Sequence, residues 1–221
     1  MRVVQPEGER GSLKWIQRAV ALKAPALEQP ILERTGASTT VWRSPLREDD
    51  FAEYRDGAFL HRLELGSLTP SLRAFWPPRG PQWDALGLTD RGDVLLVEAK
   101  SHIGEMCSPP SQASGASRDL IARRLEETAR ALGARAGHAP WIDHFYQLGN
   151  RLAHLRWLRH RGVRAWLVLV NFLGDGEMGG PVNEAEWSAA YQVAWHVMGL
   201  SRRHPLAPFV LEAFPDVGAL P

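Results

Sequence analysis

Two carboxylates and a lysine stand close together in one short stretch of this 221-residue chain. The stretch predicts a β-hairpin, with strands over Trp83–Leu88 and Val94–Lys100 and an Asp- and Gly-rich turn over Thr89–Asp93. Even closure of this hairpin places Asp84 opposite Glu98, with their Cβ atoms roughly 5 Å apart. Two like charges at that distance are destabilising unless a cation lies between them, and a divalent metal ion would serve.

The second strand of this hairpin ends in a further charge. It is apolar until its last residues, Glu-Ala-Lys, and the two-residue period of a strand puts Glu98 and Lys100 on one face. Lysine is rare in the chain, with Lys14 and Lys23 the only others. A lysine ammonium is a compact charge whose pKa shifts readily, which suits the handling of a proton or a water. An ordinary cross-strand ion pair is the alternative.

The segments before the hairpin supply further acids. Three acids at 48–50 predict the start of a helix that runs to about Leu65, because acids favour a helix N-terminus. Glu53 and Asp56 then share one helix face, for which a solvated surface is the alternative. A short strand is expected over Ser71–Trp76.

The segments after the hairpin alternate between helix and strand. Ser101–Ser117 is rich in Ser, Pro and Gly, which predicts a long loop that acts as a lid or clamp. The other expected elements are helices over Gly11–Lys23, Arg118–Leu132, Trp141–Arg161 and Asn183–Leu200, and strands over Ser38–Trp42, Val163–Phe172 and Phe209–Phe214. This order predicts an α/β fold with a mixed central sheet flanked by helices.

Bulk composition limits the classes of function. We expect a single domain over 1–221, with a core at about 45–175, an N-terminal helical preface and C-terminal additions. A formal net charge of +1 requires any nucleic-acid contact to come from a local patch. One cysteine, Cys107, suits a reducing compartment, and no apolar run is long enough to span a bilayer. A cytoplasmic protein without membrane contacts is expected.

The hairpin and its flanks resemble the PD-(D/E)xK nuclease superfamily, whose members share a restriction-endonuclease-like fold. Asp84, Glu98, Ala99 and Lys100 carry the resemblance, within a stretch from about Glu53 to Phe172. A Gln-Trp pair precedes the aspartate here, where the family has proline. The resemblance implies a restriction-endonuclease-like core and metal-dependent hydrolysis of phosphodiester bonds in nucleic acid, DNA first, and it allows a homodimer.

The resemblance also assigns roles to these residues. It implies Mg²⁺ or Mn²⁺ held by Asp84, Glu98 and the carbonyl of Ala99. Lys100 would position or deprotonate the attacking water, or stabilise the pentacovalent phosphate. The family's helix acid maps first to Glu53. Asp56 and Glu64 are its alternatives, and Gln147 corresponds to the polar residue on the helix before the last core strand.

Contacts with nucleic acid are expected from three further residues. Arg151 begins a basic stretch that ends at Arg164 and could grip phosphates, although a solvated helix face explains it equally well. Trp83 could stack on a base. His102 could contact the metal or a water, although a structural role is the simpler alternative. Two rival functions remain open: a catalytically silent nucleic-acid-binding or assembly module, and a hydrolase of small phosphate esters.

Overall fold

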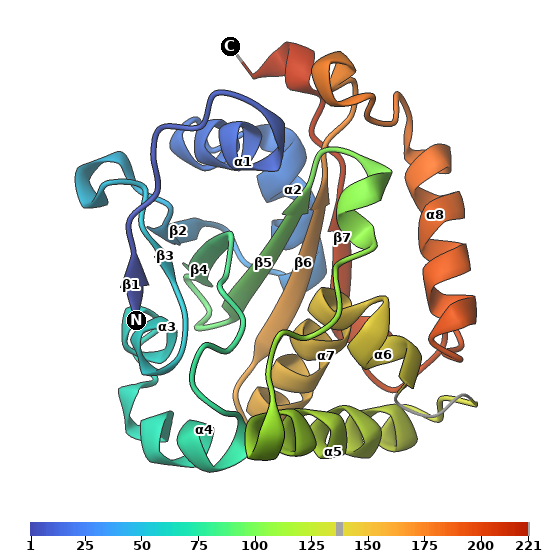
Figure 1. Ribbon diagram of the computed structural model, residues 1–221. Coiled ribbons are helices and arrows are strands. Elements are labelled where there is room, and N and C mark those ends of the chain that lie inside the picture. The colour runs from blue at the N-terminus through green and yellow to red at the C-terminus, as the bar shows by residue number, and fades with distance from the viewer. Residues whose placement is uncertain (136–138, 221) are drawn as a thin grey trace.

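A five-stranded mixed sheet forms the centre of the computed structural model, which describes residues 1–135 and 139–220 (Figure 1). The strand order is β2-β4-β5-β6-β7, in which β2, β4 and β5 are antiparallel neighbours and β5, β6 and β7 are parallel. The strands are β2 (Thr40–Ser44), β4 (Ala85–Thr89), β5 (Val94–Lys100), β6 (Ala165–Asn171) and β7 (Val210–Ala213). The expected α/β fold with a mixed sheet is confirmed.

Helices cover both faces of this sheet (Figure 1). One face carries α1 (Gly11–Ala21) and α2 (Pro25–Thr35). The other face carries α3 (Gly57–Arg62), α4 (Thr69–Phe75), α5 (Gly115–Ala131), α6 (Ala139–Asp143), α7 (Tyr146–Arg159) and α8 (Glu184–Val197). Beside the sheet, the short strands β1 (Arg2–Val3) and β3 (Glu53–Tyr54) form an antiparallel pair.

The alternation of side chains along β5 divides the apolar interior into two cores. Leu96 belongs to the core under α7, whereas Leu95 and Val97 belong to the core under α1 and α2. Successive residues of a strand face opposite sides of its sheet. Glu98 and Lys100 therefore continue the face of Leu96 and point toward α7, still within the protein interior.

The acidic segment before the hairpin is not the helix expected over residues 48–65. Arg47–Asp49 is a single 3₁₀ turn, and Glu53 lies in strand β3, where it pairs with Val3. Positive φ angles at Asp50, Phe51 and Asp56 break any helix there, and α3 begins only at Gly57. Glu53 and Asp56 therefore do not share a helix face, because pairing with a distant strand outweighs the local helical pattern.

Three other boundaries differ from expectation. Ser71–Trp76 is not a strand, because α4 begins at Thr69 with a proline in its first turn, where proline favours a helix. The helix expected over Trp141–Arg161 is two helices, α6 and α7. Trp83 lies just outside β4, although the hairpin turn and β5 match the expectation.

No helix in the described ranges is long and apolar enough to cross a membrane.

The buried β5 face predicts a large effect of truncation. Leu96 is fully buried, so Leu96→Ala is expected to lower the free energy of unfolding by about 2–5 kcal/mol through lost burial and a residual cavity. Urea unfolding measures this change. Val41→Ala, at a side chain that is 50% exposed on the outer strand, is the control and should cost less than about 0.5 kcal/mol. Equal losses of unfolding free energy in the two variants would contradict the placement of Leu96 in the core.

Candidate functional site

The two hairpin carboxylates face each other at the open end of β4 and β5. Ala85 pairs with Val97, so the same register continued by one residue places Asp84 opposite Glu98. One oxygen of Asp84 accepts a hydrogen bond of 2.7 Å from the backbone N–H of Ala99. The predicted opposition of the two acids therefore has a geometric basis in the antiparallel pairing.

Glu98 is buried and is bound by two cations. Lys100 donates to one of its oxygens, and Arg151 of α7 binds the other at 2.5 Å. Arg151 also donates to the carbonyl of Gln82 at 2.6 Å, and its guanidinium lies 4.7 Å from the centre of the Trp83 ring. All of these charged groups are nearly removed from water. Glu98 is thus the centre of a buried ionic cluster.

Two of the three residues expected to contact nucleic acid are buried. Arg151 is only 3% exposed because it neutralises Glu98, and Trp83 is fully buried beneath the Arg151 guanidinium. A buried indole offers no free face on which a base could stack. His102 lies 3.7 Å from Glu105 at the start of a 3₁₀ turn and does not line the main cavity.

Among the three candidates for the upstream acid, only Glu53 reaches this cluster. It accepts hydrogen bonds from Gln5 at 3.0 Å and Gln82 at 2.5 Å. Burial raises the pKa of Glu53 against the effect of these amide donors, and the negative charge of Glu98 raises it further. Asp56 instead accepts from the backbone of Gly80, and Glu64 pairs with an exposed arginine.

Two residues that hydrogen-bond within the cluster, Gln82 and Gln5, were not predicted from the sequence to belong to the site. Gln82 links Glu53 and Arg151 by its side chain and its carbonyl, and Gln5 comes from the chain's N-terminal segment. Residue spacing alone does not place Gln5 at the site. Gln82 lies two residues before Asp84, which is only a weak indication that it belongs to the site. Gln147 was expected, and its side-chain oxygen accepts from Lys100 at 3.1 Å.

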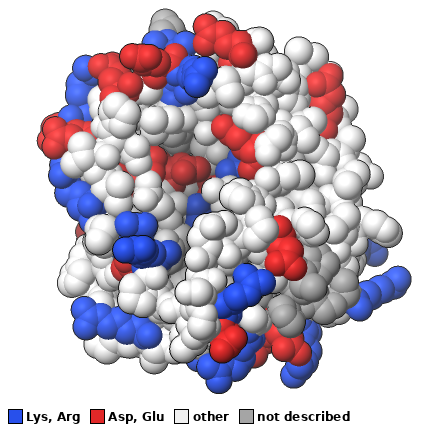
Figure 2. Space-filling model, in the orientation of Figure 1, with Lys and Arg blue, Asp and Glu red and all other residues white. Residues whose placement is uncertain are grey.

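An open cavity of about 750 Å³ lies in front of the cluster (Figure 2). Glu53, Asp84, Gln147 and Arg151 line it, together with the Pro-rich segment 77–82 and part of the Ser/Pro loop expected to act as a clamp. Figure 2 shows this face hollowed, with acidic groups visible inside the hollow and groups of both charges around it. The cavity, which we call the groove, gives a ligand access to Asp84.

Glu98 and Lys100 lie behind the groove. They line a separate cavity of about 10 Å³ together with Gln147 and Tyr191, a volume close to that of one water. The groove therefore exposes Asp84 and Glu53 directly, whereas Glu98 and Lys100 lie deeper, beside Asp84.

The charges of the cluster do not balance. Three carboxylates (Glu53, Asp84 and Glu98) face two cations (Lys100 and Arg151), and 3 − 2 leaves one excess negative charge when all are ionised. Burial and the charge of Glu98 raise the pKa of Asp84 well above its usual range. The Arg151 and Lys100 charges outweigh burial and lower the pKa of Glu98. The excess charge thus falls on Asp84, which either keeps a proton or needs a cation.

This imbalance predicts a pH dependence of stability. Because the folded state raises the pKa of Asp84, it binds the proton more tightly than the unfolded state. The stability of the wild type relative to Asp84→Asn should therefore fall as the pH rises above about 4, the ordinary value for aspartate, toward the raised pKa. Urea unfolding of both proteins in EDTA between pH 4 and 8 measures the difference. A difference that grows in favour of the wild type at higher pH would contradict it.

Few side chains are placed to bind a metal ion. Within residues 1–135 and 139–220, no three His, Cys, Asp or Glu side chains are arranged as a ready metal site. A cation at Asp84 would therefore use two carboxylates and backbone oxygen.

In comparisons with known proteins, no family model, no curated protein and no solved structure matches the chain.

Proposed function

We propose that the protein hydrolyses phosphodiester bonds of nucleic acid in a reaction that depends on Mg²⁺ or Mn²⁺, with a restriction-endonuclease-like core. One observation carries the proposal. Asp84, directly before β4, faces Glu98 on β5, with Lys100 next along the face and an uncompensated negative charge at the floor of an open groove. A divalent cation is the ligand that such an arrangement favours.

The donor set suits a hard cation. The N–H of Ala99 donates to Asp84, and the N–H and C=O of one strand residue leave from the same edge of the strand, so the Ala99 carbonyl faces the same side. The described part of the chain gives the second oxygen of Asp84 no hydrogen-bond donor. Mg²⁺ is bound by a few such oxygens and keeps several waters. Asp84, Glu98 and the Ala99 carbonyl would hold it.

The side chains around these donors have distinct tasks. A bound divalent ion neutralises charge on the phosphate and lowers the pKa of a water. Burial would lower the pKa of Lys100, but the charges of Glu98 and Asp84 outweigh it and raise the pKa. Lys100 therefore holds its proton and donates to the water or to a phosphate oxygen, rather than removing a proton. Gln147 orients the Lys100 ammonium, and Glu53 holds Gln82 against the groove.

A catalytically silent nucleic-acid-binding or assembly module is the second candidate, because both oxygens of Glu98 already have cationic partners. Lys100 and Arg151 neutralise this carboxylate without a metal. In a silent module the cluster would be a structural ion network, and Asp84 would stay protonated. The two candidates differ in whether Asp84 binds a divalent ion and whether that ion supports cleavage.

Cleavage is the direct test of the catalytic role. The purified protein with Mg²⁺ or Mn²⁺ is expected to degrade at least one of a panel of single-stranded, duplex, nicked and branched DNA and RNA substrates, and EDTA should abolish this. Lys100→Ala should lower the rate about 100-fold or more, the usual effect of removing one preorganised donor. Lys14→Ala, which removes a lysine from α1, is the matched control. Absence of metal-dependent cleavage across the panel would overturn the catalytic role.

Metal binding is a separate test of the site. Titration of Mn²⁺ followed by electron paramagnetic resonance should show one bound ion in the wild type and none in Asp84→Asn over the same range. Asp119→Asn removes an exposed acid from α5 and should bind like the wild type. Equal Mn²⁺ binding by Asp84→Asn would place the ion elsewhere.

A further inference from the structure

A second concave surface lies beside the groove and is basic. We call it the basic notch and define it by Ser71, Arg124, Glu127, Arg156, His160 and Arg161, which line a cavity of about 260 Å³. This volume is below the roughly 300–1,000 Å³ of pockets for drug-sized molecules. It suits a group the size of a phosphate rather than a whole nucleotide.

Two arginines of the notch are held in place by the protein. Arg124 donates to the backbone carbonyls of Phe75 at 3.2 Å and Ala74 at 3.3 Å. Arg161 donates twice to the hydroxyl of Ser71, at 3.0 and 2.8 Å, and stacks 4.4 Å from the centre of the Trp157 ring. Each guanidinium has five N–H donors, so both keep donors for a ligand. An oxyanion would meet arginines that are already oriented.

The notch has an excess of positive charge. Its three arginines face one acid, Glu127, which pairs with Arg124 at 2.8 Å, so 3 − 1 leaves two positive charges without counting His160. In the described part of the chain, the side chains of Arg156 and His160 have neither a hydrogen bond nor an ion pair. Arginine matches the paired oxygens of a phosphate better than any other side chain. The free charge and geometry of the notch therefore suit a phosphate.

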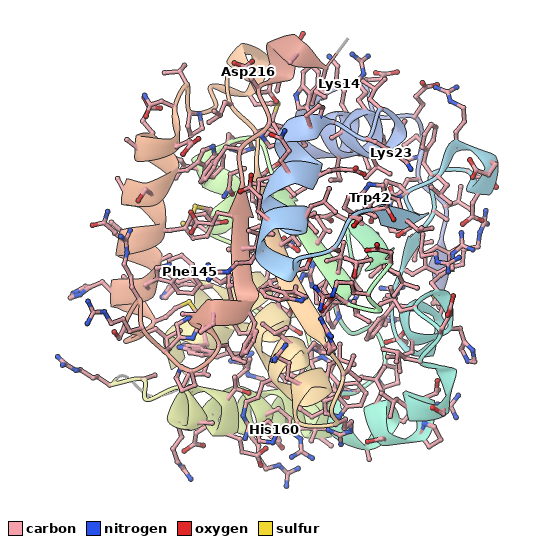
Figure 3. The ribbon with its side chains drawn as sticks, turned by 180° about the vertical axis from the view of Figure 1, so that it is seen from behind. Lys14, Lys23, Trp42, Phe145, His160 and Asp216 are labelled. Atoms are coloured by element: carbon pink, nitrogen blue, oxygen red, sulfur yellow. The ribbon has the colours of Figure 1, made fainter. Side chains whose placement is uncertain are left out.

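The position of the notch relates it to the groove. The same three segments border both: α5, α7, and α4 with the loop that follows it. On α7 the groove is lined at Arg151 and the notch at Arg156 and Trp157, which is about 8–9 Å further along the helix axis. Figure 3 shows His160 at the lower end of the molecule, beside α5.

We propose that the basic notch binds a backbone phosphate of the nucleic acid whose scissile phosphate lies at Asp84. The inference rests on the proposed function, because the groove must take nucleic acid for the notch to hold the same strand. Arg156 and His160 supply free donors, and Arg124 and Arg161 supply fixed ones. The notch would set the register of the strand on the protein without reading its sequence.

Binding without cleavage tests the notch. Fluorescence anisotropy of a labelled oligonucleotide in Ca²⁺, with Lys100→Ala as the background, measures affinity at several salt concentrations. Arg156→Gln is expected to weaken binding several-fold and to reduce the slope of log K against log salt by about 0.7–0.9, the loss of one phosphate contact. Arg156 has no partner in the described chain, so the change leaves the fold intact. Arg123→Gln, on α5 outside the notch, is the matched control and should leave the slope unchanged.

The outcomes separate the notch from the catalytic proposal. Equal effects of Arg156→Gln and Arg123→Gln overturn the notch, even when the wild type cleaves nucleic acid. Loss of binding at Arg156→Gln without any metal-dependent cleavage by the wild type supports the notch and overturns the nuclease. A parallel titration with inorganic phosphate, followed by ³¹P NMR, distinguishes the source of the phosphate. Binding of inorganic phosphate as tightly as the oligonucleotide would show that a free phosphate, not a backbone, is the ligand.

Discussion

The burial of Glu98 is the constraint on which the rest of the site depends. A carboxylate that is 3% exposed at the end of a central strand is costly unless positive charge and hydrogen bonds compensate it. Lys100 supplies one cation from the same strand face, and α7 supplies Arg151. Removal of either cation would leave an uncompensated buried charge, so the packing of α7 on the sheet and the charge state of the site are coupled.

This coupling accounts for the arrangement of the neighbouring groups. Arg151 reaches Glu98 because α7 packs on the face of the sheet toward which Glu98 points, and it reaches the carbonyl of Gln82 because the Pro-rich segment lies against that helix. Gln82 in turn holds Glu53, which enters from a separate two-stranded pair. The ion cluster therefore joins three parts of the chain that are far apart in sequence, and it forms the rear wall of the groove.

The ion cluster is compatible with both the catalytic and the silent interpretation, which differ in what compensates its excess negative charge. A fully compensated ion network would need no metal, yet Glu53, Asp84 and Glu98 outnumber their cations, and the excess charge rests on the acid that the groove exposes. A proton on Asp84 satisfies this excess in a silent module, and a divalent ion satisfies it in a nuclease. In the proposed nuclease, the basic notch would bind a backbone phosphate and the acidic floor of the groove would bind the metal ion.

Local patterns determined the sheet class, the hairpin register and the face shared by Glu98 and Lys100, because strand alternation and turn residues act over a few positions. The sequence alone did not determine which upstream acid reaches the site. An apparently helical segment became the strand that carries Glu53, since pairing with the N-terminal strand outweighed helical propensity. Only the tertiary structure decided that Arg151 is a buried counter-ion. A helix pattern shows which residues share a face, but the charge that the face meets depends on contacts between distant segments.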